Sequence, residues 1–337
     1  MNPELNQFRR DRAIRLLVPL FVFSGATSLV YETIWERQLH LIFGTSQVAV
    51  STVLAAFMTG LAMGAFGGAK WADKIKKPIL AYAGLELMIG LYAVIFPHLL
   101  ELVRPVYLGF YHSAQPSQLG FASFQFLIVG IMLLPPTFCM GMTLPLLARF
   151  ATTHTEEAGE KVGRLYGANT IGAVVGTGLA GFVLLPTFGL STTTWVTAGG
   201  NLLLCLGATL LSRTVGELDE GPSTQVDAEQ SSWQISSLAM VAMLAGLASL
   251  MHEVAWFRVF SLILGASAYA FSIMLFSFLL GIGIGGWKGG KWADKLYAEG
   301  GFKRVVMGIA IVEAGVALLT WLAMWMFGEL PWLFVLV

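Results

Sequence analysis

The chain has 337 residues, of which 56% are apolar and 12% are charged, and its formal net charge is zero. A neutral chain without a basic tract interleaved with aromatic residues is not expected to bind nucleic acid. The two cysteines, Cys139 and Cys205, have no Cys or His at metal-ligand spacing, and no nucleophile has a base at motif spacing. We therefore predict no metal, no cofactor and no catalytic residue in this chain.

Nine apolar stretches are each long enough to cross a bilayer, which requires about 20 mostly apolar residues. They cover residues 16–43, 47–69, 79–100, 121–148, 165–187, 192–211, 235–264, 267–287 and 305–327. The sequence therefore predicts an all-α, polytopic membrane helical bundle whose main partner is the lipid bilayer. A tenth stretch begins at Pro331, and we expect the natural protein to continue beyond Val337.

The basic residues predict the orientation of these stretches. With a cytoplasmic N-terminus, alternating spans place 17 of the 20 Lys and Arg residues on the cytoplasmic side, leaving Arg37, Arg104 and Arg258 for the other side. Lys and Arg are enriched in cytoplasmic loops of membrane proteins. We therefore expect a multi-pass protein of the bacterial inner membrane with its N-terminus in the cytoplasm.

Residues 25–74 and 246–295 are two copies of one segment, identical at 22 of 50 positions when aligned without a gap. The first and seventh stretches are equivalent in this alignment, so an even number of spans separates them and both cross in the same direction. This pattern predicts major-facilitator-like architecture, with two related units side by side. The first six-helix unit covers residues 1–212, a polar cytoplasmic linker covers 213–233, and an incomplete second unit covers 234–337.

Each copy carries a glycine at every fourth residue of its second span. These residues are Gly60, Gly64 and Gly68 in the first copy, and Gly281, Gly285 and Gly289 in the second. Residues 281–286 also match the Gly-x-Gly-x-x-Gly nucleotide fingerprint, but that motif needs a preceding strand. We interpret both stripes as smooth helix faces that let a neighbouring helix approach closely.

Both copies end in the sequence Lys-Trp-Ala-Asp-Lys, at the expected cytoplasmic end of the second span. Asp73 and Asp294 occupy the same position in the two copies. One hypothesis is that they gate the cytoplasmic side by accepting hydrogen bonds from a neighbouring helix end. The alternative is a solvated loop whose lysines contact anionic lipid headgroups.

Four glutamates lie within apolar sequence and are the main candidates for binding a substrate. Glu32 and Glu253 share one repeat position, whereas Glu86 and Glu313 lie near the middle of the third and ninth stretches. An ionised residue at a helix centre costs about 2.5 to 3.5 kcal/mol on insertion scales, so each must pair, face water or hold a proton. Such a site suits a cationic substrate or proton exchange.

Tyr31 and His252 precede the paired glutamates and complete the predicted substrate-binding set. A histidine at this position could relay a proton, although a lone one is more often a satisfied interior residue. Arg37 and Arg258 lie five residues after the glutamates, on a different helix face. If these arginines pair with buried carboxylates, Glu86 and Glu313 are the expected partners; otherwise they mark the outer interface.

Three motifs resemble the membrane-integral, spermidine-synthase-like proteins, described as fused major facilitator/spermidine synthase. They are Ser24–Glu32 with Trp35 and Arg37, Leu133–Thr137 with Leu144–Leu147, and Tyr166–Gly172. The resemblance implies a polytopic N-terminal module, followed in many members by a Rossmann-like domain related to aminopropyltransferases. These residues contain no such domain and could not themselves carry the synthase activity.

Two functional hypotheses follow. In the first, the module binds or transports a polyamine or related organic cation, whose two positive charges would suit Glu32 and Glu253. In the second, it is a membrane scaffold that holds a fused or associated aminopropyltransferase-like cytoplasmic domain, or a partner complex, without transport.

Overall fold

The computed structural model describes residues 3–44, 47–114, 117–152, 158–216, 232–264 and 268–327. Helices account for nearly all of these residues, and none of them lies in a strand. Among the described residues, seven helical segments are long and apolar enough to cross a membrane. The all-α class is therefore confirmed, and the segments are compatible with a multi-pass membrane protein. Most of the expected linker, and the start of a tenth span at Pro331, lie outside the described residues.

The helices follow the predicted apolar stretches closely. Their bounds are α1 (Pro3–Phe43), α2 (Gln47–Trp71), the short η1 (Ala72–Lys74), α3 (Pro78–Ala114), α4 (Gln118–Ala151), α5 (Ala158–Leu179), the π-helical turn η3 (Ala180–Leu184), α6 (Leu185–Val215), α7 (Ser232–Leu264) and α8 (Ala268–Phe327). Several extend well beyond the length that a bilayer requires, because polar residues continue the helix at its ends.

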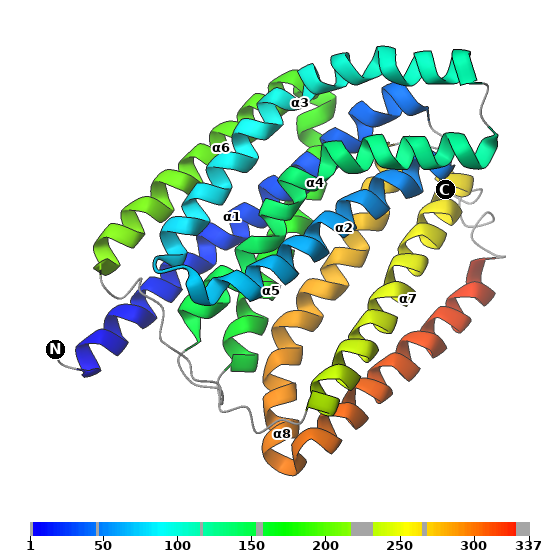
Figure 1. Ribbon diagram of the computed structural model, residues 1–337. Coiled ribbons are helices and arrows are strands. Elements are labelled where there is room, and N and C mark those ends of the chain that lie inside the picture. Colours follow the sequence, from blue (N-terminus) through cyan, green and yellow to red (C-terminus); the bar gives the residue numbers. More distant parts are fainter. Residues whose placement is uncertain are drawn as a thin grey trace.

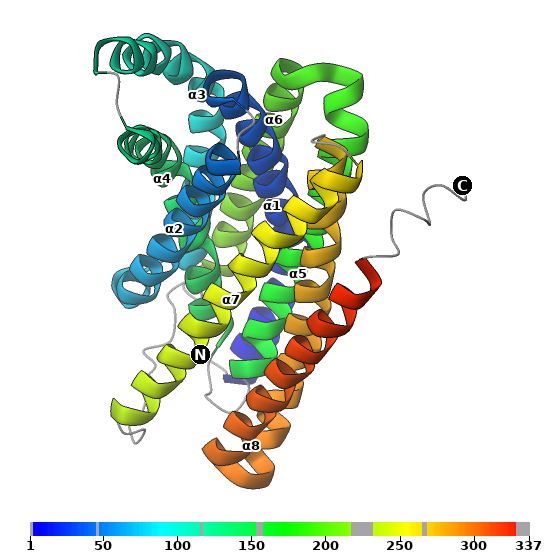
Figure 2. The same ribbon diagram turned by 90° about the vertical axis from the view of Figure 1, so that its right-hand side faces the viewer.

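Two of these segments turn back on themselves, which is why seven segments correspond to nine predicted spans. The turns lie at Gly189, with φ of 72°, and at Gly301, with φ of 62°. Left-handed backbone of this kind strains any residue that has a Cβ atom, so glycine is the natural choice. Figures 1 and 2 show the resulting reversals between α5 and α6 and within α8. We call residues 268–299 the first arm of α8 and residues 302–327 its second arm.

The bundle is built around α1, which packs against α5 and α6, while α2 packs on α4 and α3 packs on both α4 and α6. The first arm of α8 lies along α5, and α7 contacts α8. Figures 1 and 2 show α1 and α7 running in the same direction. The two repeated segments therefore cross the bundle in the same sense.

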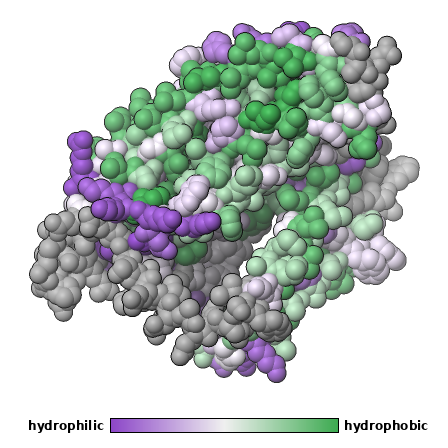
Figure 3. All heavy atoms as spheres, viewed as in Figure 1, coloured by the Kyte–Doolittle hydropathy of each residue, from purple (hydrophilic) through white to green (hydrophobic). Residues whose placement is uncertain are grey.

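The ends of the helices that carry most of the basic residues gather on one side. Figure 1 shows the start of α1, the turn between α2 and α3, the end of α6 and the reversal within α8 at the lower left and bottom of the bundle. Hydrophobic side chains cover much of the flank in Figure 3, and hydrophilic ones concentrate near its ends. This distribution is compatible with a bilayer around the middle of the helices.

The first glycine stripe faces α4. A Cβ atom on Gly64 would lie 2.1 Å from the carbonyl oxygen of Phe138, and one on Gly68 would lie 3.1 Å from the Cα atom of Met142. Gly60 meets the side chain of Thr137 in the same way. The small residues therefore let the two helix backbones approach closely.

The second stripe differs from the prediction. Gly281, Gly285 and Gly289 have no described atom within 4 Å of a Cβ position. Instead, α8 meets α5 through Gly286 and Gly290, whose added Cβ atoms would lie 2.6 Å from the Tyr166 ring and 2.4 Å from the Gly159 carbonyl oxygen. The helix face of α8 that contacts α5 carries Gly286 and Gly290. This face is rotated from the one that carries the stripe equivalent to the α2 face on α4.

Candidate functional site

Two repeat-related carboxylates are buried near each other in the interior of the bundle. Glu32 of α1 is 3% exposed and Glu253 of α7 is 1% exposed. Glu253 lies within electrostatic range of Glu32. Both carboxylate oxygens of Glu253 are buried and have no hydrogen-bond partner in the described structure. Two buried acidic groups thus lie near each other without an ion-pair partner among the described residues, an arrangement that is costly without a bound cation or proton.

The surroundings of Glu253 are apolar. Phe257, on the next turn of α7, packs with Phe271 and Leu275 of α8 and Val50 of α2. Leu29 of α1 lies against the same cluster. Within the described residues, no Lys or Arg forms an ion pair with either carboxylate. The low polarity of this environment strengthens any electrostatic interaction made there.

Glu86 belongs to a separate hydrogen-bond network that joins α1, α3 and α6. The Ser24 hydroxyl donates to its Oε1 at 2.5 Å, and the Asn201 amide donates to its Oε2 at 2.8 Å. The Oδ1 atom of Asn201 accepts a hydrogen bond from the Tyr31 hydroxyl at 3.1 Å. These neutral donors replace the arginine that the sequence suggested as a partner for Glu86. These hydrogen bonds hold Tyr31 in place.

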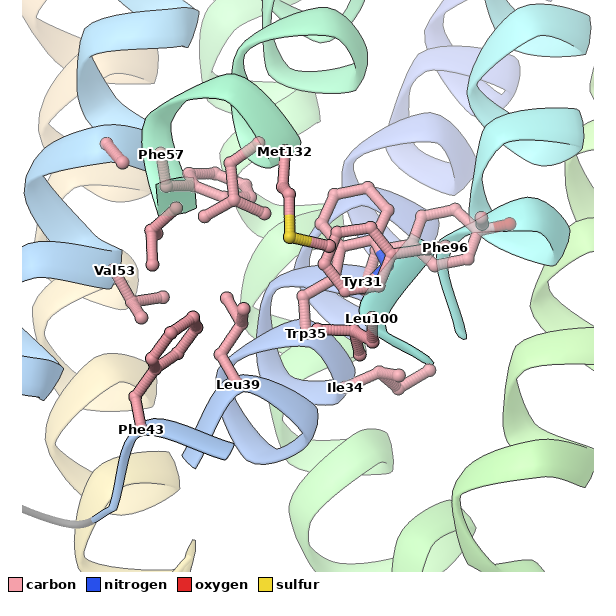
Figure 4. Close-up of a cluster of buried hydrophobic side chains, with 14 of the residues drawn as sticks. Tyr31, Ile34, Trp35, Leu39, Phe43, Val53, Phe57, Phe96, Leu100 and Met132 are labelled. Carbon is pink, nitrogen blue, oxygen red and sulfur yellow. The ribbon is translucent and has the colours of Figure 1, made fainter. Parts of the chain in front are cut away.

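Tyr31 also begins a stack of aromatic rings between α1 and α3. Its ring lies 5.3 Å from that of Trp35 at an interplanar angle of 11°, and Trp35 lies 5.2 Å from Phe96 of α3. Figure 4 shows these rings converging from α1 and α3, with Met132 above them. Offset aromatic contacts of this kind add to burial and keep the α1 side chains in defined positions.

Sequence reasoning missed two polar groups further along α1. Glu36 and His40 follow Glu32 at intervals of four residues, so all three lie on one helix face. The Nδ1 atom of His40 is 3.2 Å from Oε1 of Glu36, and Glu36 interacts electrostatically with Glu32. The four-residue spacing of these three residues in the sequence could have identified them as one polar row.

His252 and Glu313 are not buried as the carboxylate pair is, which differs from the prediction of an interior site. His252 is half-buried, and its Nδ1 atom is 2.8 Å from the Ala248 carbonyl oxygen of its own helix. It lines an apolar groove of about 500 Å³ together with Thr320 and Met324. Glu313 is exposed on the second arm of α8. A helix pattern fixes the spacing of residues but not which face meets the interior.

The two aspartates near the basic ends of the helices make different contacts. Asp73 accepts a hydrogen bond from Nη1 of Arg149 at 3.2 Å, and Nε of Arg149 donates to the Ala72 carbonyl. Asp294 accepts a hydrogen bond of 2.8 Å from the backbone N–H of Glu160, in the first turn of α5. The partial positive charge of a helix N-terminus favours a carboxylate there.

Comparisons of the chain with protein-family models, with curated proteins and with solved structures gave no match.

Proposed function

We propose that this chain is the membrane-integral module of a spermidine-synthase-like protein, and that it binds or transports a polyamine or related organic cation between Glu32 and Glu253. The observation that carries the proposal is the meeting of these two buried carboxylates without a cationic partner among the described residues. The resemblance of the α1 motif to that family supports the choice of a polyamine.

The negative charges of Glu32 and Glu253 are energetically costly when no cation compensates them. A single ionised residue in the middle of a membrane helix costs about 2.5 to 3.5 kcal/mol, and a second one nearby adds repulsion. An alkyl diamine would present an ammonium group to each carboxylate while its methylene chain contacts the apolar walls. The unpartnered oxygens of Glu253 would then accept charge-assisted hydrogen bonds.

The basic ends of the helices support an orientation with the N-terminus in the cytoplasm of a bacterium and the module in its inner membrane. In this orientation Asp73 and Asp294 lie at the cytoplasmic side, and we assign them to the gate. The bond from Asp294 to the first turn of α5 joins the second repeat to the first. Opening of the gate would require this bond to break.

Binding of spermidine to the purified full chain tests the proposal. We expect Glu32→Gln and Glu253→Gln each to weaken binding by about thirtyfold or more, because loss of one partner of a buried charge pair costs about 2 kcal/mol or more. Equilibrium binding of labelled spermidine in detergent provides the measurement, and Glu101→Gln, at an exposed position on α3, is the control.

Unchanged affinity in both carboxylate variants would exclude these residues as the site. No binding to the wild-type chain would reject the polyamine and favour the membrane scaffold.

A further inference from the structure

We infer that His40 and Glu36 form a proton path along α1, which leads from the C-terminal end of that helix to the Glu32–Glu253 pair. The inference goes beyond cation binding, since it requires the carboxylate pair but no polyamine. It assigns a role to two residues that the proposed binding site does not use.

The first support is geometric. Residues four apart on a helix have Cβ atoms about 5 to 6 Å from each other, so Glu32, Glu36 and His40 form a continuous row. His40 Nδ1 is already 3.2 Å from Glu36 Oε1. Glu36 and Glu32 interact electrostatically, and Glu32 interacts in turn with Glu253 of α7. The row therefore ends at the carboxylate pair.

The second support is the change in exposure along the row. The side chains of His40 and Glu36 are 15% and 11% exposed, whereas Glu32 and Glu253 are almost fully buried. Both ends of the row also carry atoms that lack a partner in the described structure. These are Nε2 of His40 at one end and the two carboxylate oxygens of Glu253 at the other. Each can accept a proton.

The third support comes from comparing the two copies of the repeat. Glu32 and Glu253 occupy the same position, but Glu36 and His40 correspond to Phe257 and Ser261 in the second copy. The same type of helix therefore forms without these two polar groups. Their presence on α1 alone indicates a task that packing does not explain, on one side of the pseudo-symmetric pair.

The proton transfer is balanced at each step. Nε2 of His40 is itself buried, so the first step occurs when a hydronium ion reaches the C-terminal end of α1. The hydronium ion gives a proton to Nε2 and is left as water, while the Nδ1 N–H of His40 gives its proton to the Glu36 carboxylate. The protonated Glu36 then passes its proton to the Glu32 carboxylate. The proton is then shared between Glu32 and Glu253, because two close carboxylates resist ionising together. Arg37 is the charged neighbour that acts on Glu36. No electron moves, and the reverse sequence returns the proton to water.

Infrared spectroscopy of the ligand-free full chain after a rapid pH change tests the inference. The carbonyl stretch of protonated carboxyl groups reports the pair, and its loss in Glu32→Gln and Glu253→Gln assigns the band. We expect His40→Gln and Glu36→Gln to slow the response of that band by about tenfold or more, as loss of a proton-transfer group does. Added imidazole should restore the rate in His40→Ala.

Matched controls are His98→Gln and Glu101→Gln, at exposed positions on α3, which should respond at the wild-type rate. Thermal melting identifies any variant that has lost its fold, and imidazole rescue separates a proton-transfer role from a structural one. Wild-type rates in both His40→Gln and Glu36→Gln would overturn the inference, and so would the absence of a carboxyl band that depends on Glu32 and Glu253. Because this experiment contains no polyamine, its result can be interpreted even if the chain does not bind spermidine.

Discussion

Replacement of Gly64 by leucine is expected to separate α2 from α4 and to lower the free energy of unfolding by more than about 3 kcal/mol, at the upper end of the cost of overpacking. The Cβ atom alone would lie 2.1 Å from the Phe138 carbonyl oxygen and 3.0 Å from the Cα atom of Gly141. Both are backbone atoms, which cannot rotate away as a side chain can. The helices must move apart and lose the contacts between them.

The second copy of the repeat provides a closely matched control position. Gly285 occupies the position equivalent to Gly64, and it has no described atom within 4 Å of its Cβ position. Gly285→Leu should therefore change stability by no more than about 0.5 kcal/mol, as surface substitutions usually do. Thermal and denaturant unfolding of both variants in the same detergent gives the comparison. Equal destabilisation would contradict the assignment of the two glycine faces.

Replacement of Glu86 by alanine is expected to cost about 3 to 5 kcal/mol, because removing one partner leaves buried polar groups unpaired and opens a cavity. Ser24 and Asn201 both donate to this carboxylate, and Asn201 in turn accepts from Tyr31. Loss of Glu86 therefore disturbs three helices at once. Glu86→Gln should be milder, since the amide oxygen can still accept one of the two hydrogen bonds.

Glu101 lies on the same helix in an exposed position and supplies the control. We expect Glu101→Ala to melt close to the wild-type temperature, with Glu86→Gln between it and Glu86→Ala. If Glu86→Ala and Glu101→Ala melted at the same temperature, the network would not contribute to stability.

The positions of the helices followed from the sequence because length and hydropathy are local properties. Within the described residues, each predicted apolar stretch falls on helix. The matching segments containing α1 and α7 run in the same direction, as the repeat predicted. The two buried glutamates could also be selected from the sequence, because Glu32 recurs at Glu253 in the second copy of the repeat. The reversals at Gly189 and Gly301 were implied by the gaps between apolar stretches.

The rotation of each helix about its axis could not be predicted, because it depends on contacts between distant parts of the chain. For this reason the stripe containing Gly285, which the sequence predicts to be a helix-packing face, has no close neighbour among the described residues, and Glu313 is exposed although the sequence places it in the interior. The signal for the correct face was present: Gly286 and Gly290 replace Ala65 and Ala69 of the first copy. The partners of Glu86 were similarly hidden, since Ser24 and Asn201 are distant from it in sequence.

Thiol cross-linking measures whether Glu32 and Glu253 lie close together in the folded protein. Cysteines would be placed at both positions in a chain whose only natural cysteines, Cys139 and Cys205, are replaced by alanine. A short bifunctional thiol reagent should join the pair in native membranes, as detected by mass spectrometry of the digested protein, while cysteines at 101 and 253 stay unlinked. Failure of the 32–253 pair to cross-link in folded protein, or equal linkage of the control pair, would show that the two glutamates do not lie close together.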